Sequence, residues 1–110
     1  MSQTHQETAV TGTKIRIILQ TADVRVVEYV LPPGDMHAWH HHSEVTDHFY
    51  CLEGEITIDV RDPRQTERLH MGQTLSIAPG VMHRAGNPAE CVSRYLLVQG
   101  VGRYDYVKTA

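Results

Sequence analysis

The chain has 110 residues, of which 41% are hydrophobic and 21% are charged, and its formal net charge is -3. Its length suits one domain spanning 1–110, and its composition is typical of a folded protein rather than a disordered one. It carries no basic stripe interleaved with aromatic residues, no apolar run long enough for a bilayer and no apolar leader. We therefore expect no nucleic acid and no membrane among its partners, and a cytoplasmic location with free thiols at Cys51 and Cys91.

Short strand-like patches recur along the chain, and no window shows the apolar spacing of a helix. Residues 1–12 suggest a loose arm or an edge strand. Apolar alternation or β-branched residues then mark the segments 14–20, 24–31, 48–52, 55–60, 74–78, 94–100 and 103–107. Glycine and proline separate most of these patches, and 62–67 is expected to be a turn or loop. Short strands at near-regular spacing predict an all-β sandwich or barrel.

Three consecutive histidines follow Trp39. If 37–42 is extended, His40 and His42 point to one side and His41 to the other. Residues two apart on a strand lie roughly 6.5–7 Å apart at Cα. Their imidazoles can therefore converge on one ion, each with a nitrogen at about 2.0–2.1 Å from it. The stretch is a candidate two-pronged metal clamp.

Two residues elsewhere in the chain could complete this site. Asp47 lies far enough after His42 for a turn and the start of the next strand, and His83 follows the turn residues Pro79 and Gly80. Three imidazoles and a carboxylate, with positions left for water or substrate, suit one divalent Fe, Mn, Co, Ni or Zn ion. The absence of a third or fourth cysteine argues against a closed structural zinc site. A bulge that shifted the strand register would bring His48 into the cavity in place of Asp47.

The spacing of these residues resembles that of the cupin superfamily. The first cupin motif, G-x5-H-x-H-x(3,4)-E-x6-G, matches 34–54, with Gly34, His40, His42, Asp47 and Gly54 in its positions. The second motif, G-x5-P-x-G-x2-H-x3-N, matches 72–87 at every position but the proline. The resemblance implies a single cupin domain, a double-stranded β-helix or jelly-roll barrel, with His40, His42, Asp47 and His83 as the metal ligands.

The sequence departs from the cupin pattern at two positions. Asp47 replaces the usual glutamate, and its side chain is shorter by one C–C bond, about 1.5 Å. It could bind the metal directly or through a water, leave a three-histidine site, or act as a general base through a bound water. Ala78 replaces the motif proline while Pro79 follows it, so we expect the turn before His83 to be altered slightly.

Similar frameworks host dioxygenases, isomerases, lyases and proteins that only bind, so fold alone does not decide the reaction. The leading hypothesis is a metal-dependent enzyme, dioxygenase-like or isomerase-like, acting on a small organic acid or a sugar-derived molecule. The alternative is a cupin that binds a small molecule or a metal without turnover. A homodimer is expected because small cupins commonly pair.

Overall fold

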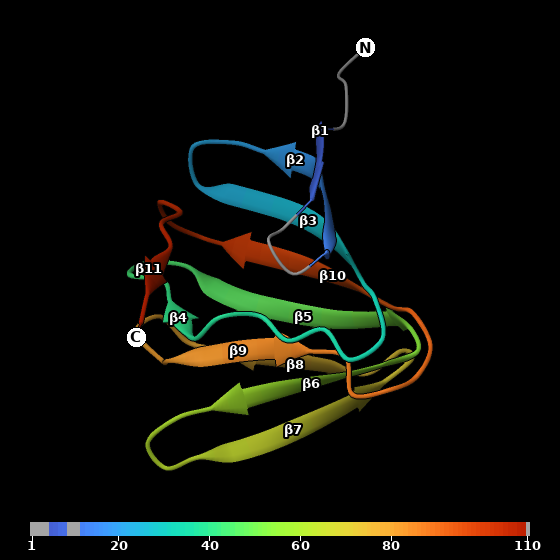
Figure 1. Ribbon diagram of the computed structural model, residues 1–110. Coiled ribbons are helices and arrows are strands. Elements are labelled where there is room, and N and C mark those ends of the chain that lie inside the picture. Colours follow the sequence, from blue (N-terminus) through green and yellow to red (C-terminus); the bar gives the residue numbers. More distant parts are fainter. Residues whose placement is uncertain (1–4, 9–11, 110) are drawn as a thin grey trace.

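The computed structural model describes residues 5–8 and 12–109, and every regular element in them is a β-strand. The strands form two antiparallel sheets (Figure 1). In spatial order, the six-stranded sheet contains β1 (His5–Thr8), β2 (Lys14–Gln20), β3 (Val24–Leu31), β10 (Ser93–Gly100), β5 (Thr46–Glu53) and β8 (Thr74–Ile77). The five-stranded sheet contains β11 (Val107–Lys108), β4 (His40–His41), β9 (His83–Gly86), β6 (Glu55–Val60) and β7 (Gln65–His70). The predicted all-β fold is confirmed. Since these ranges contain no helix, they contain none that could cross a membrane.

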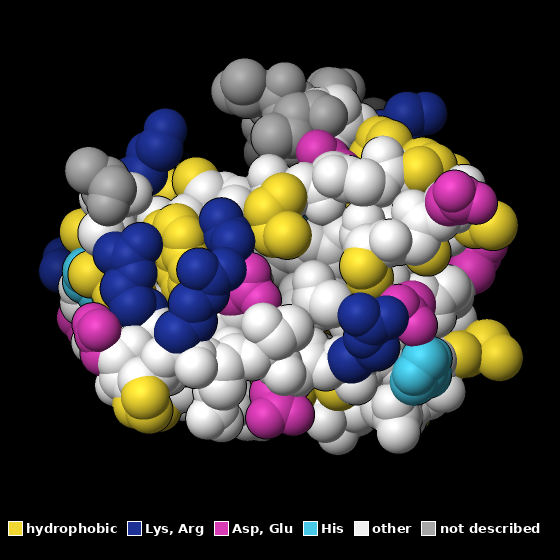
Figure 2. Space-filling view, turned by 60° about the horizontal axis from the view of Figure 1, so that its bottom comes forward, with side chains coloured by type: hydrophobic (Ala, Val, Ile, Leu, Met, Phe, Trp, Pro, Cys, Tyr) yellow, Lys and Arg dark blue, Asp and Glu magenta, His cyan; other side chains and the backbone are white. Residues whose placement is uncertain are grey.

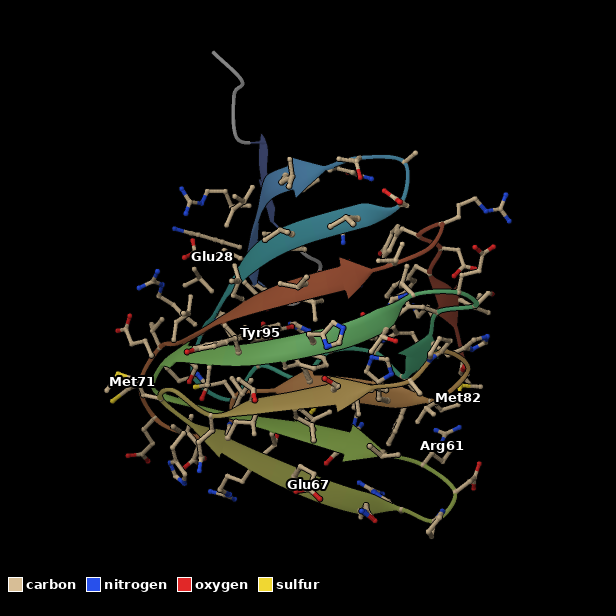
Figure 3. The ribbon with its side chains drawn as sticks, turned by 180° about the vertical axis from the view of Figure 1, so that it is seen from behind. Glu28, Arg61, Glu67, Met71, Met82 and Tyr95 are labelled. Carbon is tan, nitrogen blue, oxygen red and sulfur yellow. The ribbon has the colours of Figure 1, made fainter. Side chains whose placement is uncertain are left out.

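The hydrophobic core lies between the two sheets and follows from strand alternation. On β10, Tyr95 and Leu97 are buried while the residues between them are half-buried. On β6, Ile56 and Ile58 are both fully buried. Seen from behind, Tyr95 lies within the body of the molecule and Glu67 on its outside (Figure 3). The core therefore takes every second residue of each sheet and leaves the alternate residues for the outer faces.

Two segments differ from the sequence-based expectation. Residues 65–67, expected in a turn or loop, begin strand β7, which pairs with β6 from Gln65 to His70. β7 was missed because only Leu69 on it is buried, so it carries little apolar alternation. Residues 103–106, expected in a strand, are irregular, and pairing resumes only at Val107. The predicted N-terminal arm is described only at 5–8, where β1 pairs with β2 at the sheet edge, and at Gly12; the rest of it lies outside the described residues.

The residues before His83 form a tight turn. Val81 N donates to Ala78 O at 3.3 Å, so Pro79 and Gly80 are the two central residues. Gly80 has φ +81°, as the third residue of a type II turn must, and proline is favoured at the second. Gly80 N also donates to His42 O at 2.8 Å. The turn therefore joins the two histidine-bearing segments and is formed with alanine at position 78.

Candidate functional site

Four side chains that are remote in sequence meet at one end of the space between the sheets. His40 on β4 lies directly opposite His83 on β9 in antiparallel register. His42 follows two residues after His40, so it points to the same side. Asp47 comes from β5 in the other sheet and is buried. One potential ligand atom from each of these residues lies within 4.8 Å of the others. The structure thus brings together all four predicted site residues.

The carboxylate of Asp47 reaches the centre of this cluster despite its short side chain. Its Oδ2 lies 3.0 Å from Nε2 of His42 and 2.8 Å from Nε2 of His83. The alternative candidate His48 points the other way: it is exposed, and its Nδ1 lies 2.7 Å from Ser76 Oγ. No bulge therefore exchanges the two residues.

Each of the three histidines is held at Nδ1 by a backbone carbonyl. His40 Nδ1 donates to Ala38 O at 2.9 Å and His83 Nδ1 to Val81 O at 2.8 Å. His42 Nδ1 donates to Asp105 O at 2.6 Å. Since a carbonyl only accepts, the hydrogen of each neutral ring lies on Nδ1 and the lone pair on Nε2. This hydrogen bond to the carbonyl fixes the tautomer and the ring orientation, as it does in metal-binding histidines.

Burial and neighbouring charges shift the pKa values in the cluster in different directions. Burial lowers the pKa of His40 to about 4. Burial also opposes protonation of His42, but the hydrogen bond to Asp47 and its charge outweigh it and raise the pKa of that ring. Burial disfavours the Asp47 carboxylate, yet hydrogen bonds with His42 and His83 hold its pKa well below the usual range. Asp47 is therefore an anion that favours positive charge beside it.

Behind Asp47, a polar row crosses the inner face of the six-stranded sheet. Arg25 on β3, Gln99 on β10 and Asp47 on β5 lie opposite one another on consecutive strands. Gln99 Nε2 donates to Asp47 Oδ1 at 2.8 Å, and Arg25 donates to Gln99 Oε1 at 2.7 Å. Arg25 and Gln99 were not predicted from the sequence. The available signal was their position: each continues the inward-facing alternation of its strand as a polar residue.

A cavity of about 580 Å³ opens in front of the cluster. Its walls are apolar and aromatic over much of their extent, and they include Tyr29, Phe49, Leu97 and the cluster residues except His83. His37 also lines this cavity. Its Nε2 lies 2.9 Å from the hydroxyl of Thr13, which itself donates to Asp35. His37 Nε2 must therefore be the donor to Thr13, which leaves its lone pair on Nδ1.

The irregular segment after β10 covers one side of the cavity. Tyr106 stacks on the ring of His40 with 4.4 Å between centroids and an interplanar angle of 17°. Tyr104 lies under the guanidinium of Arg25, which is 4.3 Å from its ring centroid. The same segment supplies the carbonyl of Asp105 to His42. Its aromatic side chains thus contact the site instead of extending a sheet.

Trp39 and His41 lie away from the cluster, as their alternation predicts. The ring of Trp39 is flanked by the guanidinium groups of Arg61 and Arg84, at 4.5 and 4.6 Å from its centroid. At one end of the face shown in Figure 2, Lys and Arg side chains gather around hydrophobic atoms. His41 is half-buried and pairs through its backbone with Val107.

The family model of the cupin domain matches residues 27–99. The chain belongs to the cupin domain family. Mannose-1-phosphate guanylyltransferase of Sinorhizobium fredii is 28% identical to this cupin over 81 residues. Uncharacterized protein YdbB of Bacillus subtilis is 41% identical over 46 residues. These matches cover 71% and 42% of this cupin, but only 15% and 40% of the respective relatives.

Solved structures show the same fold at lower sequence identity. A protein of Klebsiella pneumoniae with a double-stranded β-helix domain has a TM-score of 0.82 and 21% identity, over 94% of this cupin and 90% of that chain. The polyketide cyclase RemF of Streptomyces resistomycificus has a TM-score of 0.82 and 20% identity, over 97% and 80%. An oxalate oxidase has a TM-score of 0.79 and 16% identity, over 92% and 57%. The expected double-stranded β-helix is confirmed.

Proposed function

We propose that this cupin is a divalent-metal-dependent enzyme that acts on a small organic acid or a sugar-derived molecule. His40, His42, Asp47 and His83 would hold the ion at the inner end of the cavity. The reaction would be of the dioxygenase or isomerase type. The similarity in fold to an oxalate oxidase and to a polyketide cyclase is compatible with catalysis at such a site.

The observation that carries this proposal is the orientation of the imidazoles. With Nδ1 of His42 and His83 donating to carbonyls, their neutral rings turn the lone pairs of Nε2 toward Asp47 Oδ2. Lone pairs facing a carboxylate oxygen at 2.8–3.0 Å repel one another unless a proton on the ring or a metal ion lies between them. The donor set fits a cation that prefers imidazole nitrogen and carboxylate oxygen.

Within this proposal, some residues of the chain hold the ion and others accept or donate protons. When bound, a Zn, Mn, Co, Ni or Fe ion supplies Lewis acidity, and iron also supplies oxygen activation. Asp47 is a weak proton acceptor because its pKa lies well below the usual range, so we assign it to holding the ion rather than to general-base catalysis. His37 can accept a proton at Nδ1, and burial lowers the pKa of its ring, which favours the neutral, unprotonated form.

Metal titration of chelator-treated protein tests the site. We expect one ion per chain and a loss of affinity of roughly 100-fold or more in His83→Ala. His48→Ala is the matched control: it removes the histidine next to Asp47 that points away from the cluster, and it should leave affinity within threefold. A substoichiometric ion content, or equal losses in both variants, would contradict the proposal.

Turnover separates the enzyme from a cupin that only binds. Protein loaded anaerobically with iron is screened for oxygen uptake with small acids and enediols, and protein loaded with manganese or zinc is screened for isomerisation of sugar-derived substrates. We expect turnover in at least one of these two screens, and we expect His83→Ala to abolish it. Full metal occupancy without turnover in any arm would favour the non-catalytic alternative.

A further inference from the structure

Arg25 is a buried cation that forms no ion pair with a described carboxylate. Its residue is 9% exposed, and it donates a hydrogen bond to the neutral amide of Gln99. Other arginines of the same fold behave differently. Arg84 pairs with Asp59 at 2.9 Å, and Arg94 pairs with Glu28 at 2.6 Å. Both are more exposed than Arg25, yet each has a carboxylate partner. Because an uncompensated buried charge is costly, the charge of Arg25 favours an anion beside it.

The guanidinium of Arg25 is held in a fixed plane beside the cavity. Its face lies over the ring of Tyr104 at 4.3 Å, and one edge donates to Gln99 Oε1 at 2.7 Å. Stacking on an aromatic ring leaves the in-plane N–H groups available as donors, and the planar fork matches the geometry of a carboxylate. Burial raises the pKa of the adjacent Tyr29 to about 12, although Arg25 acts against this rise. Tyr29 therefore stays protonated, and its hydroxyl can donate to the same anion.

The charge balance of the cavity also favours an anion. Its lining contains two permanent cations, Arg25 and Lys108, and one carboxylate, Asp47. Asp47 is already engaged by His42, His83 and Gln99, so it does not neutralise Arg25 directly. With neutral histidines the lining carries a net charge of +1, and a divalent ion would raise this further. Much of the remaining wall is apolar, including Ile15, Met36 and Leu97.

We propose that Arg25 binds the carboxylate of the substrate, which is a monocarboxylate with an apolar body. The carboxylate would accept hydrogen bonds from the free edge of the guanidinium. The apolar body would lie against the wall formed by Ile15, Tyr29 and Met36. This inference rests on the proposed function for the identity of the cavity as a substrate site. It deepens that function because it names the residue that selects an acid over a neutral molecule of the same shape.

Calorimetry with paired acids and amides tests the role of Arg25. The probes are glycolate and mandelate, each compared with its neutral amide, on metal-free and zinc-loaded full-length chain. We expect wild type to bind mandelate roughly tenfold or more tightly than mandelamide, and Arg25→Gln to lose that preference. Lys108→Gln removes the other cation of the lining and should change mandelate affinity less than threefold. Zinc affinity of Arg25→Gln should stay within threefold of wild type.

Each other outcome has a defined meaning. Failure of mandelate to bind at millimolar concentration, equal affinity for mandelate and mandelamide, or an equal loss in Lys108→Gln would overturn the role of Arg25. A parallel loss of zinc and mandelate affinity in Arg25→Gln would make Arg25 a positioning residue for Asp47 and also overturn it. If wild type fails to bind zinc, the metal proposal fails, while the acid–amide comparison on metal-free protein still decides the role of Arg25.

Discussion

Asp59 is a buried carboxylate on the outer face of β6, remote from the metal cluster. Thr66 donates to its Oδ1 at 2.6 Å, and Arg84 donates to its Oδ2 at 2.9 Å. The guanidinium of Arg84 also stacks on Trp39. Burial opposes ionisation of Asp59, but these hydrogen bonds and the charge of Arg84 hold its pKa below the usual range. Asp59 thereby orders a strip that joins β7, β6 and β9.

The low pKa of Asp59 predicts a pH-dependent contribution to stability. A carboxyl whose pKa is depressed by folding stabilises the protein above the unfolded pKa of about 3.9 and loses this effect as pH falls through the folded value. Asp59→Asn should therefore reduce the free energy of unfolding by about 1–2 kcal/mol at pH 6, and by less below pH 4. Urea unfolding followed by fluorescence measures the difference. Glu67→Gln, an exposed change on β7, should show little loss at either pH.

The residues of the site differ in how far the sequence predicts them. His40 and His42 are candidates from spacing alone, because residues two apart on a strand can converge on one ion. His83 was selected from its place after the turn at Pro79 and Gly80 and from the resemblance to the second cupin motif. The register that admits Asp47 and excludes His48 needed the structure, since one residue of slip exchanges them. Arg25 and Gln99 were missed because their partners lie on other strands. The pairing of the strands places Gln99 between Arg25 and Asp47, and only this register shows that the three polar residues form one row.

At the scale of elements, the turn between β5 and β6 depends on Gly54. Its φ is +72°, and a Cβ added there would lie 2.7 Å from Ser93 Oγ and 2.9 Å from Val92 O. Gly72, in the turn between β7 and β8, has a similar φ of +87°, but an added Cβ would meet nothing within 4 Å. Both glycines have a positive φ, but only Gly54 lacks space for a side chain.

Alanine at these two positions separates backbone strain from steric overlap. Gly72→Ala should lose about 1 kcal/mol of unfolding free energy through the left-handed conformation alone. Gly54→Ala should lose at least about 1 kcal/mol more, because the methyl group overlaps the backbone of Val92 as well as the Ser93 hydroxyl. Thermal or urea unfolding of both variants gives the comparison. Equal losses would show that the turn relaxes around the methyl group.

Strands were predicted correctly where one face of the strand is apolar. The predictions failed at the edge strand β7 and in the segment 103–106. β2, β3 and β6 were predicted with their observed bounds. β7 is an edge strand with one buried residue, so its sequence lacks the alternation that identifies its neighbours. The segment 103–106 carries tyrosines at alternate positions, which suggested a strand. Those rings are instead used in stacking on Arg25 and His40, a tertiary role that periodicity does not distinguish from core packing.

For the whole molecule, the cluster joins the two sheets. His40 and His83 belong to the five-stranded sheet, whereas Asp47 belongs to the six-stranded sheet. An ion shared among them would cross-link the sheets, and it would bind the folded chain in preference to the unfolded one. Metal binding is therefore coupled to global stability.

Chelation should lower the melting temperature of metal-loaded protein. At a free metal concentration 100-fold above Kd, binding contributes about 2.7 kcal/mol. For a domain of this size, about 4–8 °C per kcal/mol gives a decrease of about 10–20 °C on chelation. Differential scanning calorimetry with and without chelator at neutral pH measures it, and His83→Ala should show no chelator effect. An unchanged melting temperature in wild type would show that the ion does not stabilise the barrel.

The segment that follows β10 has a consequence for protein engineering. Asp105 contributes no atom to the cluster, yet its carbonyl oxygen decides which nitrogen of His42 carries the hydrogen. Any fusion, insertion or crystal contact that pulls this segment aside would release the ring to its other tautomer and expose the stacked face of His40. A graft of the four cluster residues onto another scaffold would therefore need this stretch of main chain as well as the side chains.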